Sequence, residues 1–420
     1  MRALQVYLRG RLIGRLAENR KGARFAYEPE VAEANAGRPL LSLCMPVKKK
    51  PFGEEKTRSW FEGLLPEGDR RGRICREFQV PENDWLGLLS QIGWECAGAV
   101  QVFPEGGASI EASGYEPLRK AELAKKLVQV SAQSAGAADV PFRMSLGGFQ
   151  NKLCVAMPCI GGAAPTVAAR GIKLPCGTAP STHILKPEPS AYPGLAESEA
   201  WAMTVAASAA RCAKVALLNV EGAPETLVVE RYDRQRGAEG EIERLHQEDA
   251  CQALALPAMR KYASSPVAKG DDPTYKAIAE LLLRFSPDPQ GELQELLRQL
   301  TVNFVLGNWD AHAKNTSLLY REPAAPGLAP LYDVVPICDV EPRTTLLSMR
   351  IAGSLDPESV SRETILAEAV SWGLGAAEAA ELLNSCLEQL QEGLKTGARR
   401  YPDAAKKHQR NAKRRLGLLE

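Results

Sequence analysis

The residues whose types and spacing best suit chemistry lie in the polar run Asn308-Trp-Asp-Ala-His-Ala-Lys-Asn315. Within it, Asp310 and Asn315 have the D-x-x-x-x-N spacing of loops that carry out phosphoryl transfer. That chemistry requires an Asp to accept a hydrogen bond from the attacking hydroxyl while an Asn oxygen holds a metal ion on the phosphates. Because a pair with this spacing is also common in ordinary turns, other residues must support the assignment.

Two more charged residues fit the same chemistry. Asp333 follows an apolar run and could supply a second metal ligand. Lys186 ends the apolar run that begins at Thr182, where a lysine that pairs with ATP phosphates would lie. Glu197 or Glu199, at the start of the next predicted helix, could form the ion pair that orients this lysine, and the sequence does not choose between them.

A glycine-bearing segment from Ser145 to Lys152 lies between two predicted strands and contains Gly147 and Gly148. Because strands flank it on both sides, the segment predicts a hairpin that covers phosphates rather than a Walker loop, which leads into a helix. Lys152, where the chain leaves the hairpin, could also approach nucleotide phosphates.

Residues 1–105 predict a strand-rich unit, since they contain short runs in which apolar residues alternate. We expect strands at residues 4–8, 24–27 and 41–45, and helices at residues 57–65 and 84–92. A stretch rich in Gly and Ala follows and indicates a connection, so a domain boundary is expected near residue 105.

Residues 106–232 predict a small mixed lobe, and residues 233–420 a mostly helical one. In the first, we expect helices at 118–130 and 197–212 and strands at 152–157, 182–186, 215–220 and 226–230. In the second, we expect helices at 247–256, 275–285, 292–306, 362–372 and 376–395.

The features follow one another in the order that a two-lobed kinase requires: glycine hairpin, strand lysine, acidic helix, strand pair, D-x-x-x-x-N pair and Asp333. The sequence therefore predicts an α+β, two-lobed protein-kinase-like fold. Its N-terminal subdomain would be β-rich and its C-terminal lobe mostly helical.

Composition limits the alternatives. The 52 basic and 51 acidic residues give a net charge of +1, so no global attraction to nucleic acid or membrane is indicated. Ten scattered cysteines without a C-x-x-C pair and four dispersed histidines argue against a zinc site. We expect a cytoplasmic protein with reduced thiols, because the sequence shows neither a signal peptide nor a long apolar run.

Several motifs resemble those of HipA-type kinases, a family of bacterial toxin kinases. The resemblance covers nearly the whole chain and is most specific in Glu230-Arg-Tyr-Asp-Arg234 and Asp310-Ala-His-Ala-Lys-Asn315. The other matching segments are residues 60–68, 145–152, 182–187, 244–249 and 330–336.

The resemblance implies a serine/threonine protein kinase that uses ATP and Mg²⁺. Carried across by motif, it implies that Asp310 is the catalytic base and that Asn315 and Asp333 are the Mg²⁺ ligands. It also implies that Lys186 binds the ATP phosphates.

Further roles follow from the same resemblance. Backbone groups of Glu230 and Tyr232 would bind adenine, and His312 and Lys314 would stabilise the loop or the transferred charge. Ser145 would be an autophosphorylation site, since roughly two added negative charges would eject the hairpin and block ATP binding. The alternative for Ser145 is a serine that hydrogen-bonds its own turn.

Members of this family pair with a small helix-turn-helix antitoxin of the HipB type, which binds operator DNA and restrains the kinase. Some phosphorylate an aminoacyl-tRNA synthetase, so the resemblance implies a protein substrate connected with translation. Two other functions stay open: a small-molecule kinase on a related fold, and a catalytically weak corepressor bound to a helix-turn-helix antitoxin.

The tail at residues 395–415 carries nine basic residues and one acid, Asp403. Such a tail could contact nucleic-acid phosphates. Its low aromatic content favours a solvated, frayed terminal helix instead.

Overall fold

The fold comes from a computed structural model of the 420-residue chain. It describes residues 2–106, 113–132, 151–160, 166–238, 240–263, 272–341 and 343–420. The predicted glycine hairpin, with Ser145, Gly147 and Gly148, lies outside the described residues.

The N-terminal unit is an antiparallel sheet in the order β3-β2-β1-β4, covered by helices. Its strands are Ala3–Leu8 (β1), Arg11–Asn19 (β2), Gly22–Tyr27 (β3) and Val100–Pro104 (β4). Its helices are Pro29–Ala34 (α1), Glu54–Glu62 (α2), Gly68–Glu77 (α3) and Trp85–Ile92 (α4). Leu4, Val6 and Leu8 are buried, because alternate residues of β1 face the core.

The strands expected at residues 4–8 and 24–27 are confirmed, as is the helix expected at 84–92. The strand expected at residues 41–45 is wrong. Its apolar side chains are buried as expected, but Ser42 and Leu43 hydrogen-bond to the Glu248 carboxylate, and the segment is a loop. The apolar residues alternate in the sequence of this loop as they do in a strand, so the sequence pattern could not separate the two.

A second sheet has five strands in the order β6-β9-β11-β10-β7. These are Leu153–Val155 (β6), Thr166–Val167 (β7), His183–Pro187 (β9), Val215–Leu218 (β10) and Thr226–Glu230 (β11). Only β10 and β7 pair in parallel among these described strands. A separate ribbon pairs Gly114–Pro117 (β5) with Lys173–Cys176 (β8).

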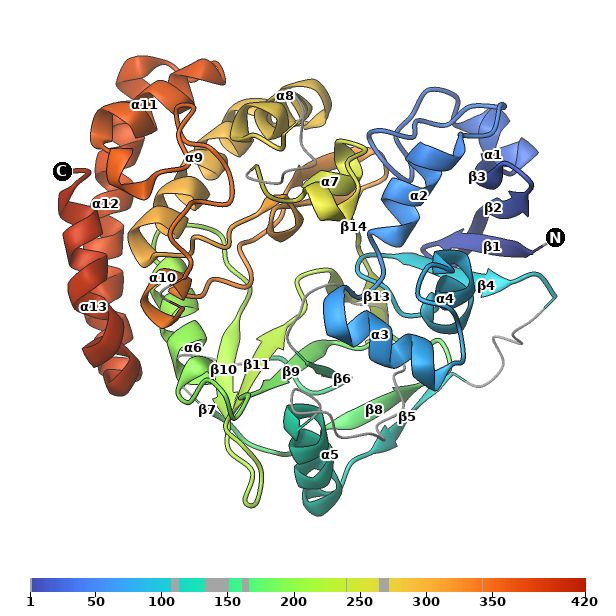
Figure 1. The fold of residues 1–420 in the computed structure, drawn as a ribbon, viewed down its shortest axis with the longest axis horizontal. Helices are drawn as coiled ribbons and strands as arrows, with labels where there is room; N and C mark the ends of the chain where they lie inside the picture. The colour runs from blue at the N-terminus through green and yellow to red at the C-terminus, as the bar shows by residue number, and fades with distance from the viewer. Residues whose placement is uncertain are drawn as a thin grey trace.

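Helices cover both faces of this five-stranded sheet. On one face, Val228 of β11 packs with Leu123 and Leu127 of Lys120–Ala132 (α5). On the other face, Leu227 and Val229 share a core with Leu195–Ala206 (α6) and with the helical part of the chain. Figure 1 shows α6 between the sheet and the helices α10 and α13. The helix expected at 197–212 is therefore present but ends earlier, at Ala206.

The helical part begins with small β elements. The ribbon β12-β13 is followed by the three-stranded sheet β14-β15-β16. The strands are Arg234–Arg236 (β12), Ile242–Arg244 (β13), His246–Asp249 (β14), Ser317–Glu322 (β15) and Ala325–Leu328 (β16).

The helices of this part are Ala250–Ala253 (α7), Tyr275–Phe285 (α8), Pro289–Leu306 (α9), Ile337–Val340 (α10), Arg362–Ser371 (α11), Ala376–Arg400 (α12) and Pro402–Gly417 (α13). Short 3-10 turns cover Ala258–Arg260, Ala313–Asn315 and Pro357–Ser359. The expected helices at 275–285, 292–306, 362–372 and 376–395 are confirmed, with small shifts at their ends.

The helix expected at 247–256 is wrong. Residues 246–249 form β14, which pairs with β15, and Asp249 then caps the short helix α7. Pairing with a strand about 70 residues away in sequence overrode the local helical pattern.

The C-terminal helix α13 is packed rather than frayed, which corrects the expectation for the tail. Arg415 is buried, donates to the Val305 carbonyl at 2.9 Å and lies 3.3 Å from the Asp339 carboxylate. The outer face of the tail carries exposed basic residues, including Lys406 and Arg410. In the described part of the chain, no helix is long and apolar enough to cross a bilayer.

A buried carboxylate joins the N-terminal unit to the rest of the molecule. Glu248 of β14 is 1% exposed. It accepts hydrogen bonds from Ser42 (2.6 Å), the Leu43 amide (2.9 Å), Trp60 (2.9 Å) and Tyr320 (2.5 Å). Three of these donors belong to the N-terminal unit, so one carboxylate fixes that unit against β14 and β15.

A second joint forms around Glu95, which follows α4. Arg231 contacts Glu95 at 3.1 Å and makes a two-pronged pair with Asp233 at 2.9 and 2.7 Å. Arg234 and Arg244 contact the same Glu95 carboxylate. Burial alone would raise the pKa of Glu95, but the three arginines outweigh it and lower the pKa to about 2.

We predict that Glu95→Gln destabilises the protein by about 3 kcal/mol at neutral pH, because buried arginines lose their charge partner. Since the folded-state pKa is lowered, the Glu95 contribution is complete above the unfolded pKa of about 4.3 and is lost as the pH falls towards 2. In urea unfolding, the difference between wild type and variant should therefore shrink on acidification. A difference at neutral pH below about 1 kcal/mol, the scale of an exposed ion pair, would contradict this role.

Candidate active site

A cavity of about 350 Å³ lies where the N-terminal unit, the five-stranded sheet and the helical part meet. Its volume falls in the range of small-ligand sites, roughly 300 to 1,000 Å³. Nine of the candidate residues line it: Lys152, Lys186, Glu230, Tyr232, Asp310, His312, Lys314, Asn315 and Asp333. The fold thus gathers in one place groups that are far apart in the sequence.

Lys186 is the centre of a group of three charges, in which Lys186 and Glu199 are buried and Asp333 is partly exposed. From β9, its Nζ donates to Glu199 at 2.6 Å and to Asp333 at 2.5 Å. Glu199 lies on α6 with a side chain 1% exposed. Glu197 points elsewhere and accepts from the Asp403 amide at 3.2 Å, because residues two apart on a helix lie on nearly opposite sides. The structure therefore selects Glu199 as the lysine's partner.

Lys186 and Asp333 stabilise each other's ionised forms. Burial alone would lower the pKa of Lys186, but the carboxylates of Asp333 and Glu199 outweigh it and raise the pKa above its usual value. Burial alone would raise the pKa of Asp333, but Lys186 lowers it to about 2. The pKa of Glu199 is raised, chiefly by burial. Lys186 is therefore fully charged at neutral pH.

Asp333 has an unusual backbone conformation, with φ at 60°. Non-glycine residues seldom adopt this left-handed region, although Asp tolerates it better than most. Such conformations cluster at functional sites, where the surrounding structure maintains them. Here the conformation accompanies the contact between Asp333 and Lys186.

The catalytic-loop candidates lie between α9 and β15. Asn315 donates through Nδ2 to the Asp310 carbonyl at 3.1 Å, so its amide oxygen is the atom left to meet a cation. The Asp310 Oδ1 atom accepts a hydrogen bond from the Tyr262 hydroxyl at 2.8 Å. Burial raises the pKa of Asp310, and the Tyr262 hydrogen bond opposes this effect.

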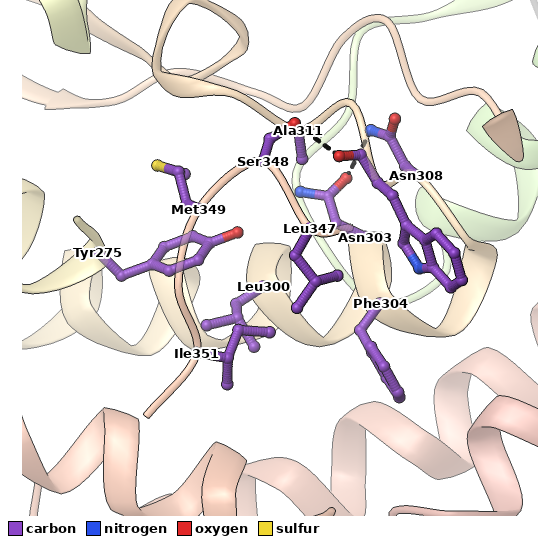
Figure 2. Close-up of a pocket in the computed structure, with 11 residues that line it drawn as sticks. Tyr275, Leu300, Asn303, Phe304, Asn308, Ala311, Leu347, Ser348, Met349 and Ile351 are labelled. Atoms are coloured by element: carbon purple, nitrogen blue, oxygen red, sulfur yellow. Dashed lines mark hydrogen bonds between the residues drawn. The ribbon is translucent and has the colours of Figure 1, made fainter. Parts of the chain in front are cut away.

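Polar contacts hold the backbone at the start of this loop, as Figure 2 shows for Asn303, Asn308 and Ser348. Asn308 donates to Asn303 of α9 at 2.9 Å, and the Ser348 hydroxyl donates to the Trp309 carbonyl at 2.6 Å. The space among them is about 10 Å³, roughly the size of one water molecule. These hydrogen bonds therefore hold the backbone that leads into Asp310.

Lys314 and His312 lie in the same loop but face different surroundings. The Lys314 ammonium donates to Asp249 at 2.6 Å and to the Gly63 carbonyl at 2.9 Å, which ties the loop to the N-terminal unit. Burial, and then the charge of Lys261, lowers the pKa of His312 to about 3, so its ring is neutral. These contacts favour a loop-holding role for Lys314.

Lys152 is partly buried in the cavity wall. Its pKa is lowered to about 7 by burial and then by the charges of Arg70 and Lys186. A phosphate group beside it would favour the charged form. This setting suits a lysine that meets an anion.

Glu230 is the last residue of β11, and Tyr232 comes two positions later; both line the cavity. The Tyr232 ring packs on Tyr332 with centroids 5.6 Å apart, and its hydroxyl hydrogen-bonds to Gln247. The Glu230 carboxylate accepts from the Ile160 amide at 2.8 Å. Their side chains are thus engaged by protein groups, and adenine binding would use the backbone.

Sequence reasoning missed Glu67, Lys261 and Tyr262. Glu67 and Lys261 line the cavity and pair at 2.9 Å. Glu67 lies in the segment 60–68 that resembles the family, but no role followed from that resemblance. Tyr262 belongs to no recognisable motif, so only the fold reveals its contact with Asp310.

The oxygen donors suit a magnesium ion shared with a nucleotide. Mg²⁺ commonly takes one or two protein oxygens and completes its shell with water and phosphate oxygens. Asn315 and Asp333 offer two such donors in the cavity wall. In the ranges that the structure describes, no group of three or more His, Cys, Asp or Glu residues could hold a metal. The donor set therefore fits a cation that the phosphates help to bind.

Two family models match the chain. The HipA N-terminal domain matches residues 4–103, and the HipA-like C-terminal domain matches residues 144–394. The chain belongs to the HipA family of kinases. The resemblance found in the motifs is thereby confirmed over most of the HipA-like chain.

Relatives of this HipA-family chain agree with the assignment. A candidate kinase of Sinorhizobium fredii, Y4mE, is 37% identical over 360 residues, which cover 84% of this chain and 81% of the relative. The serine/threonine-protein kinase toxin HipA of Shewanella oneidensis is 27% identical over 371 residues, covering 85% and 80%.

A solved structure of HipA with HipB and operator DNA, from Shewanella oneidensis MR-1, superposes with a TM-score of 0.79 at 22% identity. The superposition covers 99% of this chain and 98% of the other. The predicted α+β, two-lobed HipA-like fold is therefore confirmed.

We predict that Glu199→Gln weakens binding of a non-hydrolysable ATP analogue with Mg²⁺ by roughly tenfold, the cost of losing one charged hydrogen bond that orients Lys186. Isothermal titration calorimetry would measure the dissociation constant. Glu197→Gln makes the same chemical change on the same helix and serves as the control, with an expected change below about twofold. Equal effects of the two variants would contradict the selection of Glu199.

Proposed function

We propose that this HipA-family chain is an ATP- and Mg²⁺-dependent serine/threonine protein kinase that acts as the toxin of a HipA/HipB-like pair. The observation that carries the proposal is the convergence of Lys186, Asp310, Asn315 and Asp333 on one cavity. These side chains offer the phosphate-binding, base and cation-binding groups that phosphoryl transfer needs. Relatives named as kinases support the same reaction class.

Asp310 is the proposed catalytic base. Its carboxylate would accept the hydrogen bond of a serine or threonine hydroxyl and orient the oxygen towards the γ-phosphate of ATP. The hydroxyl oxygen forms the new bond to phosphorus as the bond to ADP breaks, and its proton passes to Asp310. The contacts of Asn308 and Ser348 beneath the loop support this role, because they hold the backbone on which the base depends.

Lys186 and Asp333 would exchange partners when the nucleotide binds. In this structure, they neutralise each other at 2.5 Å. In the complex, Lys186 would turn to the ATP phosphates, and Asp333 and Asn315 would offer oxygens to the cation. Bound Mg²⁺ would neutralise phosphate charge in the transition state. Glu199 would keep the lysine oriented throughout, because it is buried beside it.

The remaining assignments extend this proposal. Lys152, Gly147 and Gly148 would contact the phosphates, backbone groups of Glu230 and Tyr232 would bind adenine, and His312 and Lys314 would support the loop. Ser145 would be the autophosphorylation site. The roles of Ser145, Gly147 and Gly148 rest on the family resemblance, since these residues lie outside the described residues.

The proposed partners follow from the relatives. The solved HipA structure contains HipB and operator DNA, which supports a HipB-like antitoxin and a DNA partner. We propose that the antitoxin carries most of the DNA contact. We propose a protein substrate connected with translation, such as an aminoacyl-tRNA synthetase. We also propose three structural units, at residues 1–105, 106–232 and 233–420, with α6 packing across the boundary between the last two.

We predict that incubation with Mg²⁺ and ATP adds one phosphate to the wild-type chain. Asp310→Ala should remove this addition, because the acceptor hydroxyl loses its base, and Ser145→Ala should remove it because the acceptor itself is lost. Intact-mass spectrometry followed by peptide mapping would measure the addition and its site. A fall of at least about a hundredfold in rate is expected for Asp310→Ala, in line with general base catalysis.

The control is Asp403→Ala, which removes an exposed carboxylate on α13 and should leave the rate unchanged. Phosphate transfer to a metabolite with no protein labelled would contradict a protein kinase and support a small-molecule kinase. ATP binding without any transfer, together with intact binding of antitoxin and DNA, would instead support the corepressor alternative.

A further inference from the structure

Tyr262 makes a contact that the proposed reaction does not yet explain. It lies just after the 3-10 turn Ala258–Arg260, and its hydroxyl donates to Oδ1 of the proposed base Asp310 at 2.8 Å. Its ring meets the buried ring of His312 edge-on, with centroids 5.1 Å apart and planes at 81°. One side chain thus contacts both the base and the residue two positions after it.

The backbone around Tyr262 is fixed against the same loop. The Lys261 carbonyl accepts from the Ala313 amide at 3.2 Å, and the Ala263 amide donates to the Ser348 carbonyl at 2.9 Å. Ser348 in turn donates through its hydroxyl to the Trp309 carbonyl. Both chain neighbours of Tyr262 are therefore hydrogen-bonded to segments that hold the catalytic loop. These contacts fix the backbone that carries the Tyr262 hydroxyl.

The N-terminal unit anchors this segment through Glu67. The Lys261 ammonium, 5% exposed, pairs with Glu67 at 2.9 Å. The same Glu67 lies 4.0 Å from the ammonium of Lys314 in the catalytic loop. A buried pair of this kind is costly to break from one side, so it fixes the position of residues 261–263.

We propose that Tyr262 is a positioning residue that fixes the carboxylate of Asp310 and directs its second oxygen to the acceptor hydroxyl. This inference rests on the proposed kinase function. A carboxylate has two oxygens. Of the two in Asp310, only Oδ1 accepts a hydrogen bond from a side chain among the described residues. With Oδ1 held by Tyr262, Oδ2 is the oxygen that can accept the proton of the attacking hydroxyl.

The hydroxyl, rather than the ring, carries the proposed role. Tyr262→Phe removes only that hydroxyl and keeps the edge-on contact with His312 and the backbone contacts of residues 261 and 263. Loss of a hydrogen bond to a charged group, or a small misplacement of a reacting group, costs roughly tenfold to a hundredfold in rate. A role in stability alone would instead appear as a fall in melting temperature and ATP affinity.

The matched control is Tyr27→Phe in the N-terminal unit. Tyr27 is also a packed tyrosine, and its hydroxyl donates to the Met45 carbonyl at 2.8 Å, the length found for Tyr262. The whole 420-residue chain, in excess over ATP and with saturating Mg²⁺, would be followed through a single turnover by ADP formation and intact mass. Binding of a non-hydrolysable ATP analogue and the melting temperature would be measured on the same samples.

For Tyr262→Phe, we expect transfer at least about tenfold slower, with analogue affinity within about twofold of wild type. Tyr27→Phe should transfer at the wild-type rate. Glu67→Gln, which keeps the hydroxyl but weakens the anchor of its segment, should give a smaller fall in rate.

A Tyr262→Phe rate within about twofold of wild type would overturn the inference and leave the kinase proposal standing, provided that Asp310→Ala is inactive. Equal losses of rate, analogue affinity and melting temperature would overturn it too, since they indicate a structural role. A wild-type chain that transfers no phosphate would overturn both proposals.

Discussion

A buried lysine keeps its charge when carboxylates lie beside it, and the packing of several elements brings two carboxylates to Lys186. One carboxylate, Glu199, comes from α6, and the other, Asp333, comes from the segment that follows β16. For both to reach β9, α6 must pack on the sheet and on the helical part at once, which is how its core residues lie. The geometry of the site therefore depends on the packing of the two lobes against each other. Asp333 contacts Lys186 with its backbone in a left-handed conformation.

The N-terminal unit is tied into the site by the same kind of interaction. Glu248 accepts hydrogen bonds from four donors on both sides of the joint, and Glu95 binds three arginines, of which Arg231 lines the cavity. Closer to the cavity, Gly63 accepts from Lys314, and Glu67 pairs with Lys261. Buried charges tolerate little displacement, because an unpaired partner costs several kcal/mol. The unit thus forms one wall of the cavity and restrains the loop that carries Asp310.

The sequence reveals those parts of the site whose signal is local. The spacing of Asp310 and Asn315, and the order of the features around them, could be seen without a fold, and nine of the described candidates do share one cavity. The choice of Glu199 over Glu197 depends on the rotation of α6 against β9, which no local pattern encodes. Tyr262 could not be found, because its meaning lies in a contact with a residue 48 positions away.

The fold shows the same division between local and distant causes. Amphipathic helices such as α8 were placed at their observed ends, because burial of one face follows from the residues themselves. Residues 41–45 and 247–249 differ from the prediction because Glu248 and β15, both distant in sequence, decide their conformation. The arginines next to Tyr232 are a further case, since their side chains serve the joint at Glu95 and only the structure shows it.

We propose that one cavity binds Mg²⁺ and ATP through an exchange of partners between Lys186 and Asp333. A crystal structure of the chain with Mg²⁺ and a non-hydrolysable ATP analogue would test this exchange. We predict a cation on oxygens of Asn315 and Asp333, the ammonium of Lys186 on the phosphates and on Glu199, and Asp310 facing the γ-phosphate. A nucleotide bound outside this cavity would overturn the proposal, as would one bound inside it with Lys186 and Asp333 still paired and no cation between Asn315 and Asp333.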